Sequence, residues 1–150
     1  MSAIRRATMQ DVEAVARLFR DTRQTSLPYL PDLHSAAAER RYFAEQVFAD
    51  CQVWLAEPDG IHGFCAFRPG WVDHLYIRPE WQRRGLGSAL LAQAMTGQQW
   101  LHLRAFQRNV PALRFYAARG FREIARSDGS RNEEGEPDLL LEWRAVEAQA

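Results

Sequence analysis

The chain has 150 residues, of which 47% are hydrophobic, and its 19 basic side chains balance its 19 acidic ones. A chain of this length fits a single domain over residues 1–150 that would bury roughly two-thirds of its unfolded surface. The balanced charge gives no argument for a nucleic-acid partner, and no run reaches the roughly 18 apolar residues of a membrane span. We therefore expect a cytoplasmic protein with no nucleic-acid or membrane partner; a homodimer is one expected assembly.

Cysteine and histidine usage gives little reason to expect cross-links or metals. Cys51 and Cys65 lack metal-ligand spacing and are too few for a disulfide framework, so we expect reduced thiols. No pair among the four histidines has the helical spacing of metal ligands, so we expect no metal site.

The first third of the chain alternates extended and helical segments. Residues 4–7 form a predicted strand, and Thr8 caps a run whose apolar residues recur at helical spacing. Residues 22–35, interrupted by two prolines, are predicted to form an irregular apolar loop. Ser35 then caps a second predicted amphipathic helix.

Three strands are predicted next, at residues 51–57, 62–68 and 71–77. The turns Pro58-Asp59-Gly60 and Pro69-Gly70 separate them so closely that we expect an antiparallel meander.

The remaining predicted elements are a helix at 88–95, a strand at 100–105, a helix at 111–119, and strands at 121–126 and 139–143. The sequence therefore predicts a mixed α/β (α+β) fold, with a mostly antiparallel seven-stranded sheet flanked by four helices.

Residues 82–88, which read QRRGLGS, stand where a strand leads into a helix. Glycines at a helix N-terminus let an anion approach backbone N–H groups, so a phosphate cradle is the first interpretation. A Walker loop would need Lys and then Ser or Thr after Gly87, but Ser88 and Ala89 stand there, so this motif is excluded. A dinucleotide fingerprint would need a small residue at position 90, which is Leu, so this motif is disfavoured. The plain alternative is a glycine-rich turn with solvated arginines.

Several further residues occur in an order and at distances typical of one family. They are Leu75-Tyr76-Ile77-Arg78-Pro79, Gln82-Arg83-Arg84-Gly85-Leu86-Gly87, Asn109, Ala112, Phe115-Tyr116 and Gly120-Phe121. Together with the order of the elements, this pattern resembles the GNAT superfamily of acetyl-CoA-dependent N-acyltransferases across nearly the whole chain.

The resemblance implies two contacts with CoA. The main chain of Leu75, Tyr76 and Ile77 would pair with the pantetheine arm like an added strand. The pyrophosphate would be held at the start of the third helix by Arg83, Arg84, Gly85, Leu86, Gly87 and Ser88. The Arg84 side chain has an alternative, which is to face solvent while the backbone binds.

The resemblance also implies that Tyr116 protonates the leaving thiolate. A phenol with a pKa of about 10 can donate to a thiolate whose conjugate acid has a pKa near 8.5. The alternative is that Tyr116 is simply a core side chain of an aromatic-rich helix. Asn109 could cap this helix, or cap it and also touch the pantetheine. A backbone N–H of the 75–77 strand would meet the oxyanion.

The proton of the attacking amine needs an acceptor. In similar proteins the base stands on the strand before the cradle, at the positions of Asp73 and Trp71, and Trp71 cannot serve. Asp73 is therefore the candidate base, and its alternative is an ion pair with an arginine such as Arg104. His74 and His102 are expected to be hydrogen-bonded sheet residues instead.

Candidate substrate contacts are Tyr29 and Leu30 in the proline-flanked loop and Trp71. Leu33, Trp81 and the acids Glu133, Glu134 and Glu136 could join them around an aromatic or cationic amine. The plain alternative is that the loop covers the core and the acids form a solvated hairpin tip.

We expect an N-acetyltransferase that uses acetyl-CoA as cosubstrate, without a metal, and transfers the acetyl group directly to a primary amine in a ternary complex. Neither cysteine falls in the motif segments, so no covalent intermediate is expected. A small-molecule acceptor is expected. The alternatives are a protein lysine or N-terminus as acceptor, or a non-catalytic acyl-CoA sensor.

Overall fold

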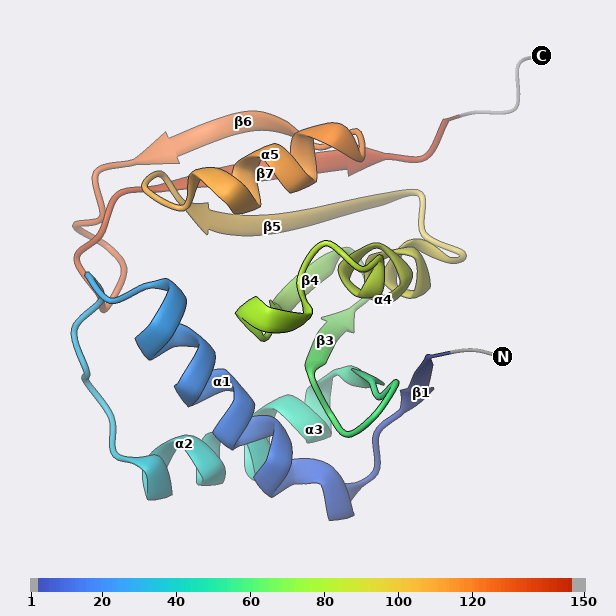
Figure 1. Ribbon diagram of the computed structural model, residues 1–150. Helices are drawn as coiled ribbons and strands as arrows, with labels where there is room; N and C mark the ends of the chain where they lie inside the picture. The colour runs from blue at the N-terminus through green and yellow to red at the C-terminus, as the bar shows by residue number, and fades with distance from the viewer. Residues whose placement is uncertain (1–2, 147–150) are drawn as a thin grey trace. The chain divides into compact units, whose positions relative to one another are not determined.

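A computed structural model of the protein describes residues 3–146, which form two compact units. The first unit comprises residues 3–68 and 72–96, and the second comprises residues 69–71 and 97–146. Figure 1 labels most of their strands and helices, numbered in chain order. The expectation of a single domain stays a prediction.

The strands of the first unit are β1 (Ile4–Arg6), β2 (Gln52–Ala56), β3 (Gly63–Arg68) and β4 (Trp71–Ile77), of which only Trp71 belongs to the second unit. The strand β2 pairs antiparallel with both β1 and β3, and β4 is the next neighbour of β3. The three strands predicted between residues 51 and 77 are confirmed to within one residue at each end.

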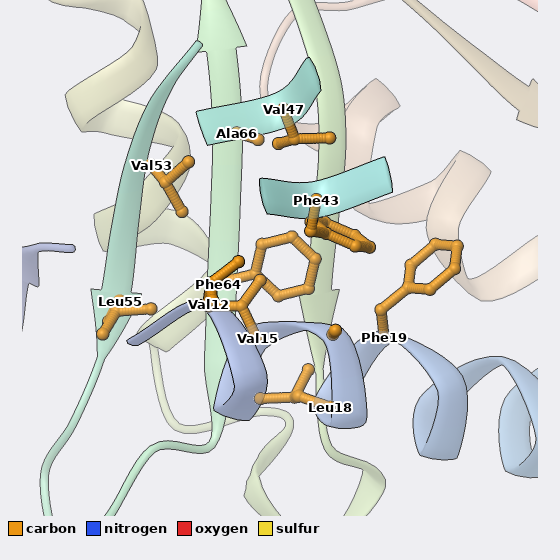
Figure 2. Close-up of a cluster of buried hydrophobic side chains, with 11 residues drawn as sticks. Val12, Val15, Leu18, Phe19, Phe43, Val47, Val53, Leu55, Phe64 and Ala66 are labelled. Carbon is orange, nitrogen blue, oxygen red and sulfur yellow. The ribbon is translucent and has the colours of Figure 1, made fainter. Parts of the chain in front are cut away.

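The core of the first unit lies between helix α1 (Val12–Ser26) and the sheet (Figure 2). Helical spacing and strand alternation bring together Val12, Val15, Ala16, Leu18, Phe19, Phe43, Val47, Val53, Leu55, Phe64 and Ala66. Thr22 is buried on the same helix face and α1 continues to Ser26, so the prediction that the loop begins at residue 22 is wrong. The helix ends two residues before Pro28, because the residue that precedes a proline disfavours the helical conformation.

The second helical segment consists of α2 (Ala36–Tyr42), the π-helical turn η2 (Phe43–Val47) and α3 (Phe48–Asp50). The Ser35 side chain accepts a hydrogen bond from the Ala38 N–H at 3.0 Å, which confirms the predicted cap. Phe43 and Val47, at the two ends of the π-helical turn, are both buried.

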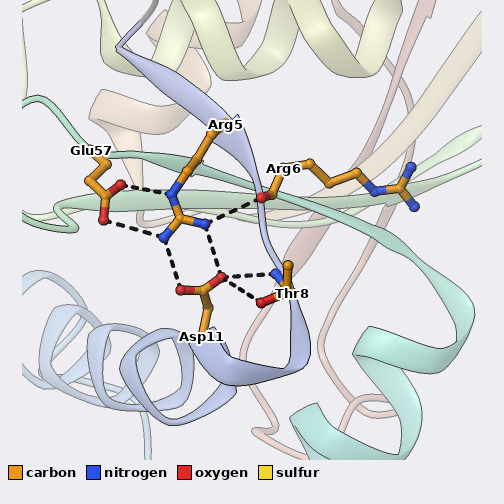
Figure 3. Close-up of polar contacts among 5 residues, drawn as sticks. All are labelled: Arg5, Arg6, Thr8, Asp11 and Glu57. Atoms are coloured by element: carbon orange, nitrogen blue, oxygen red, sulfur yellow. Dashed lines mark hydrogen bonds and ion pairs between the residues drawn. The ribbon is translucent and has the colours of Figure 1, made fainter.

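An ion cluster fixes the start of the chain (Figure 3). The Arg5 guanidinium donates to Asp11 at 2.9 Å and to Glu57 at 2.7 Å, and it lowers the pKa of both carboxyls. Asp11 also accepts the Thr8 N–H at 2.8 Å. The cluster therefore joins β1, the end of β2 and the 3-10 turn η1 (Met9–Asp11) that leads into α1.

After β4 the chain passes through the 3-10 turn η3 (Pro79–Trp81) into helix α4 (Leu86–Met95). The helix starts two residues before the predicted residue 88 and packs on β2 and β3. Its buried side chains are Leu86, Leu90, Leu91 and Ala94.

The second unit contains β5 (Trp100–Phe106), α5 (Val110–Ala118), β6 (Arg122–Ser127) and β7 (Asp138–Arg144). The strand β7 pairs antiparallel with both β5 and β6. Trp71, the first residue of β4, pairs in parallel with His102 of β5, so the sheet is mixed.

Residues 3–146 thus contain seven strands and four helical segments, when α2, η2 and α3 are counted as one segment. The predicted fold class is confirmed. No helix within this range is long and apolar enough to cross a bilayer.

Candidate functional site

Helix α4 begins at a left-handed glycine. Gly85 is the capping residue, with φ +84°, and a Cβ built there would meet no atom within 4 Å. Conformation, rather than space, therefore requires glycine at this position. Arg83 has a φ of +63°. Among residues 3–146 it is the only non-glycine residue with a positive φ. Two left-handed residues on either side of Arg84 turn the chain into the helix.

The first turn of α4 points its backbone N–H groups out of the helix. The Ala89 N–H donates to the Gly85 carbonyl at 3.0 Å, so the N–H groups of Leu86, Gly87 and Ser88 precede the first helical hydrogen bond. The turn contains no acidic side chain. The positive end of the helix dipole and these donors make an arrangement suited to an anion such as phosphate.

The predicted pantetheine strand lies directly before this loop. Leu75, Tyr76 and Ile77 are half-buried, and the Tyr76 ring stacks on Phe64, with centroids 5.8 Å apart. Gln82 donates its side-chain N–H to the Ile77 carbonyl at 3.0 Å, which holds the loop against the end of β4. Pairing of this main chain with pantetheine stays a prediction.

The Arg84 side chain is exposed and lies over an aromatic ring. Its guanidinium carbon lies 4.5 Å from the ring centroid of Trp81, and the His62 ring stacks on Trp81 at 3.9 Å with an interplanar angle of 12°. The alternative given for Arg84, a side chain that faces solvent, is compatible with its exposure, and a contact of its guanidinium with the pyrophosphate stays a prediction.

Asp73, the candidate base, lies on β4 in an ion pair with Arg68. The Arg68 Nε donates to Oδ2 at 2.8 Å and its Nη2 donates to Oδ1 at 3.1 Å. The expected ion pair of Asp73 is therefore present, but the partner named from the sequence was wrong: Arg104 lies 3.6 Å from Asp138 instead. The role of Asp73 as base stays a prediction.

Cys51 lies beside the same carboxylate. Its Sγ donates to the Asp73 Oδ2 at 3.4 Å, and burial together with the negative charge of Asp73 raises the pKa of the thiol to about 12. Burial also raises the pKa of the Cys65 thiol. Thiols that stay protonated are poor nucleophiles, which argues against a cysteine-linked intermediate.

The two sheet histidines have hydrogen-bond partners, as predicted. The His74 Nε2 lies 3.0 Å from the Tyr42 hydroxyl, within a group of aromatic rings, and burial lowers the pKa of His74 to about 4. The His102 Nε2 lies 2.8 Å from the Glu142 carboxylate. No group of three or more potential metal ligands among His, Cys, Asp and Glu occurs in the described part of the chain.

Tyr116, the candidate acid, lies on helix α5 in the second unit. Its side chain is buried, and its ring makes edge contacts with Phe115 at 5.2 Å and Phe121 at 5.3 Å. The Tyr116 carbonyl accepts the N–H groups of Arg119 and Phe121, which turns the chain from α5 towards β6. The packing fixes the ring, and its catalytic role stays a prediction.

Asn109 caps the same helix. Its side-chain oxygen accepts the Ala112 N–H at 3.4 Å, and Pro111 stands in the first turn. The predicted cap is confirmed, while the contact with pantetheine stays a prediction. Helix α5 thus links Asn109 to Tyr116. In the same way, the β4–α4 connection links residues 75–77 to residues 83–88.

The candidate substrate residues belong to both units. Tyr29 and Leu30 are half-buried in the loop after α1, whereas Leu33 is 47% exposed. The Trp71 ring, in the second unit, packs edge-on against His102 at 5.5 Å. Their contact with a substrate stays a prediction.

The acidic hairpin between β6 and β7 is not simply a solvated tip. Glu136 is buried and accepts two hydrogen bonds of 2.8 Å from Arg108, which lower the pKa of its carboxyl. For Glu136 the solvated interpretation is wrong, because this carboxylate anchors the loop to the segment before α5.

Sequence reasoning missed Arg68 as a neighbour of the site, and it named Trp81 only as a possible substrate contact. Arg68 could have been found from hairpin register, because a two-residue turn places it diagonally across from Asp73. Trp81 lies three residues before Arg84, but no pattern in the sequence indicated that the two side chains would stack.

Comparison with known proteins places these features in a family. A model of the acetyltransferase (GNAT) domain matches residues 49–123, half of the chain. The peptidyl-lysine N-acetyltransferase YiaC of Escherichia coli (strain K12) is 31% identical over 102 residues, covering 66% of this chain and 68% of YiaC. The peptidyl-lysine N-acetyltransferase YjaB of Salmonella typhimurium is 25% identical over 130 residues, covering 85% of this chain and 88% of YjaB.

A solved structure agrees in fold. YncA from Salmonella typhimurium, solved with its cofactor acetyl-CoA, superposes with a TM-score of 0.72 over 98% of this chain and 95% of YncA. The two sequences are 16% identical, so this likeness shows the shared fold.

Proposed function

Because the chain belongs to the GNAT family of acetyltransferases, we propose that it transfers the acetyl group of acetyl-CoA directly to a primary amine in a ternary complex. The match of the family domain to residues 49–123 carries this proposal, because that segment includes the left-handed loop and the first turn of α4. As a member of the family the chain is an acetyl-CoA-dependent acetyltransferase, which leaves the non-catalytic sensor without support.

Acetyl-CoA would bind along the β4–α4 connection and α5. The backbone of residues 83–88 would hold the pyrophosphate, and the acid-free first turn of α4 supports this assignment. The main chain of residues 75–77 would pair with the pantetheine arm, and Asn109 would touch it while capping α5.

The transfer requires two proton movements and one charge to be stabilised. Asp73 would accept the proton of the amine, directly or through water, and the neutral nitrogen would attack the thioester carbon. A backbone N–H of residues 75–77 would stabilise the oxyanion. As the carbon–sulfur bond breaks, Tyr116 would donate its phenolic proton to the CoA thiolate.

The acceptor we assign is a lysine side chain of a protein. Both named relatives are peptidyl-lysine N-acetyltransferases, which supports this assignment. Trp71 and Trp81, both named as candidate substrate contacts, have protein neighbours: Trp71 packs on His102, and Trp81 packs on His62 and Arg84. A small-molecule amine is the second candidate, and the half-buried Tyr29 and Leu30 of the proline-flanked loop favour it.

Mass spectrometry of acceptors can separate these candidates. All 19 basic residues of the chain are arginine, so every acetyl-lysine detected belongs to the acceptor. An N-terminally blocked lysine peptide should gain one acetyl group for each CoA thiol released, and the same peptide with arginine for lysine should gain none. Acetylation of small amines alone would assign the second candidate, and no transfer to any amine would overturn the proposal.

A further inference from the structure

Trp81 lies at the edge of the loop that leads into α4, next to Arg84. We infer that Trp81 is a positioning residue, which holds the Arg84 guanidinium ready for a phosphate of CoA. The inference rests on the proposed function, and it adds a side chain that does not itself touch the cosubstrate.

Arg84 is available for an anion. Among residues 3–146 no carboxylate forms an ion pair with it, whereas Arg68 and Arg108 each bond a carboxylate with two N–H groups. Its guanidinium lies over the indole, 4.5 Å from the ring centroid. A guanidinium held over an aromatic face keeps its N–H donors, which lie in its own plane, directed outward to an oxyanion.

Trp81 can act as a support because it is itself fixed. The His62 ring stacks on it at 3.9 Å, and the backbone N–H of Trp81 donates to the Arg78 carbonyl at 2.9 Å. The His62 Nε2 in turn lies 2.6 Å from the Asp59 carbonyl. A guanidinium held against this support loses less conformational freedom when a phosphate binds than one on a mobile side chain.

Arg83 provides a matched control. It is exposed, lies next to Arg84 in the same loop and carries the same charge, but it has no ring beneath it within the described residues. Removing either charge weakens the general attraction for CoA, whereas only Arg84 depends on Trp81.

A double-mutant cycle tests the inference with a lysine peptide as acceptor. Arg84→Gln should raise the KM for acetyl-CoA and the Kd for CoA about tenfold, as expected for losing a hydrogen bond to a charged group. Trp81→Leu should raise both about threefold, and Trp81→Phe should restore most of the loss. The kcat should stay unchanged, because binding of the ground state and of the transition state is weakened equally.

The decisive comparison is between backgrounds. Trp81→Leu should have no further effect when combined with Arg84→Gln, but its full effect when combined with Arg83→Gln. Repeating the titrations with 3′-dephospho-CoA identifies the phosphate. If Trp81→Leu also weakens the binding of 3′-dephospho-CoA, Arg84 contacts the pyrophosphate. If that effect vanishes, Arg84 contacts the 3′-phosphate. Both results support the inference.

A Trp81→Leu effect that persists in the Arg84→Gln background would overturn the inference, as would a lower melting temperature with unchanged CoA affinity. Trp81→Phe, which keeps an aromatic face, provides a folded variant if Trp81→Leu is unstable. Wild-type protein that neither binds acetyl-CoA nor transfers acetyl groups would overturn the proposed function instead. Wild-type protein that does both, with Trp81→Leu equal to it, would overturn the positioning role alone.

Discussion

Arg68 holds Asp73 with two hydrogen bonds, of 2.8 and 3.1 Å, across the turn between β3 and β4. The pair orients the carboxylate that we assign as base, and both of its oxygens accept from the guanidinium. Asp73 is therefore half of an ion pair, and in our proposal it has a second, separable role as a proton acceptor.

Substitution of each partner in turn separates these roles. Asp73→Asn should lower kcat by about 10²- to 10⁴-fold, the range for loss of a general base, while Arg68→Gln leaves the carboxylate in place and keeps most of the activity. Both should lower the free energy of unfolding by only about 0.5–1 kcal/mol, because the pair is partly exposed. The measurements are the pH dependence of kcat/KM and denaturant unfolding. If Asp73→Asn and Arg68→Gln lowered kcat equally and only slightly, the proposed role of Asp73 as base would be wrong and only the ion pair would remain.

Tyr116→Phe removes the proposed acid while keeping the ring packed against Phe115 and Phe121. We expect kcat to fall about 100-fold, with the Kd for CoA unchanged, because the phenol acts only on the departing thiolate. Tyr42→Phe, which removes the hydroxyl bonded to His74, is the control and should leave kcat unchanged. Full turnover of the Tyr116→Phe variant in thiol-release assays would remove Tyr116 from the mechanism.

Gly85, which caps α4, and Gly87, in its first turn, should respond in opposite ways to substitution by alanine. Gly85→Ala should cost about 1 kcal/mol of stability, because the φ of +84° is unfavourable for a residue with a Cβ. Gly87 lies within α4, where alanine is favoured by up to about 1 kcal/mol, but a methyl group there would obstruct the approach of a phosphate. We therefore expect Gly87→Ala to melt at a higher temperature and to bind CoA more weakly. Unchanged CoA affinity in Gly87→Ala would contradict the phosphate assignment.

His74 should make stability fall in mildly acidic solution. Its pKa is lowered from 6.5 to about 4, chiefly by burial, with a smaller contribution from the charge of Arg23 and an opposing one from Asp73. Between those values the unfolded chain binds a proton that the folded chain does not, so stability is lost as pH falls from about 6.5 to 4, by a few kcal/mol at most. In His74→Phe this part of the pH dependence should disappear from urea unfolding curves. A slope identical to that of the wild type would show that His74 contributes nothing to this pH dependence, which would contradict its lowered pKa.

Acid below this window should act through Asp11. Arg5 lowers the pKa of this carboxyl, so the stability it contributes is present above its unfolded pKa and is lost as pH falls through its folded pKa. Asp11→Asn should therefore flatten the loss of stability below about pH 4, the unfolded value for aspartate, in the same unfolding curves. If the Asp11→Asn variant lost stability below about pH 4 as steeply as the wild type, the loss would have to come from other carboxyls.

Local patterns were sufficient to predict most elements of the fold. The period of Val12, Val15 and Phe19 predicted α1, and paired turns predicted the three central strands. The end of α1 was placed too early, because Thr22 is polar by type but is buried on the apolar face. The proline that ends the helix is a more direct local signal than the loss of apolar periodicity.

The candidate site was less accessible to sequence, because side-chain partners depend on register and on contacts distant in the chain. Gly85 has a left-handed φ, which is a local requirement for glycine, whereas the anion contact that the sequence predicts for Gly85 and Gly87 stays a prediction. The sequence offers Arg104 as an example of a partner for Asp73, but Arg104 pairs with Asp138. It also offers a solvated hairpin tip for Glu136, but Arg108 bonds this carboxylate. The stack of His62, Trp81 and Arg84 joins two turns, and no single segment predicts it.

The most direct test of the proposed activity combines binding and turnover in one sample. The purified protein is titrated with acetyl-CoA in a calorimeter, and a lysine peptide is then added while CoA thiol is measured. We predict saturable binding followed by thiol release equal to the acetyl groups gained by the peptide. Saturable binding without thiol release from any amine would contradict the account.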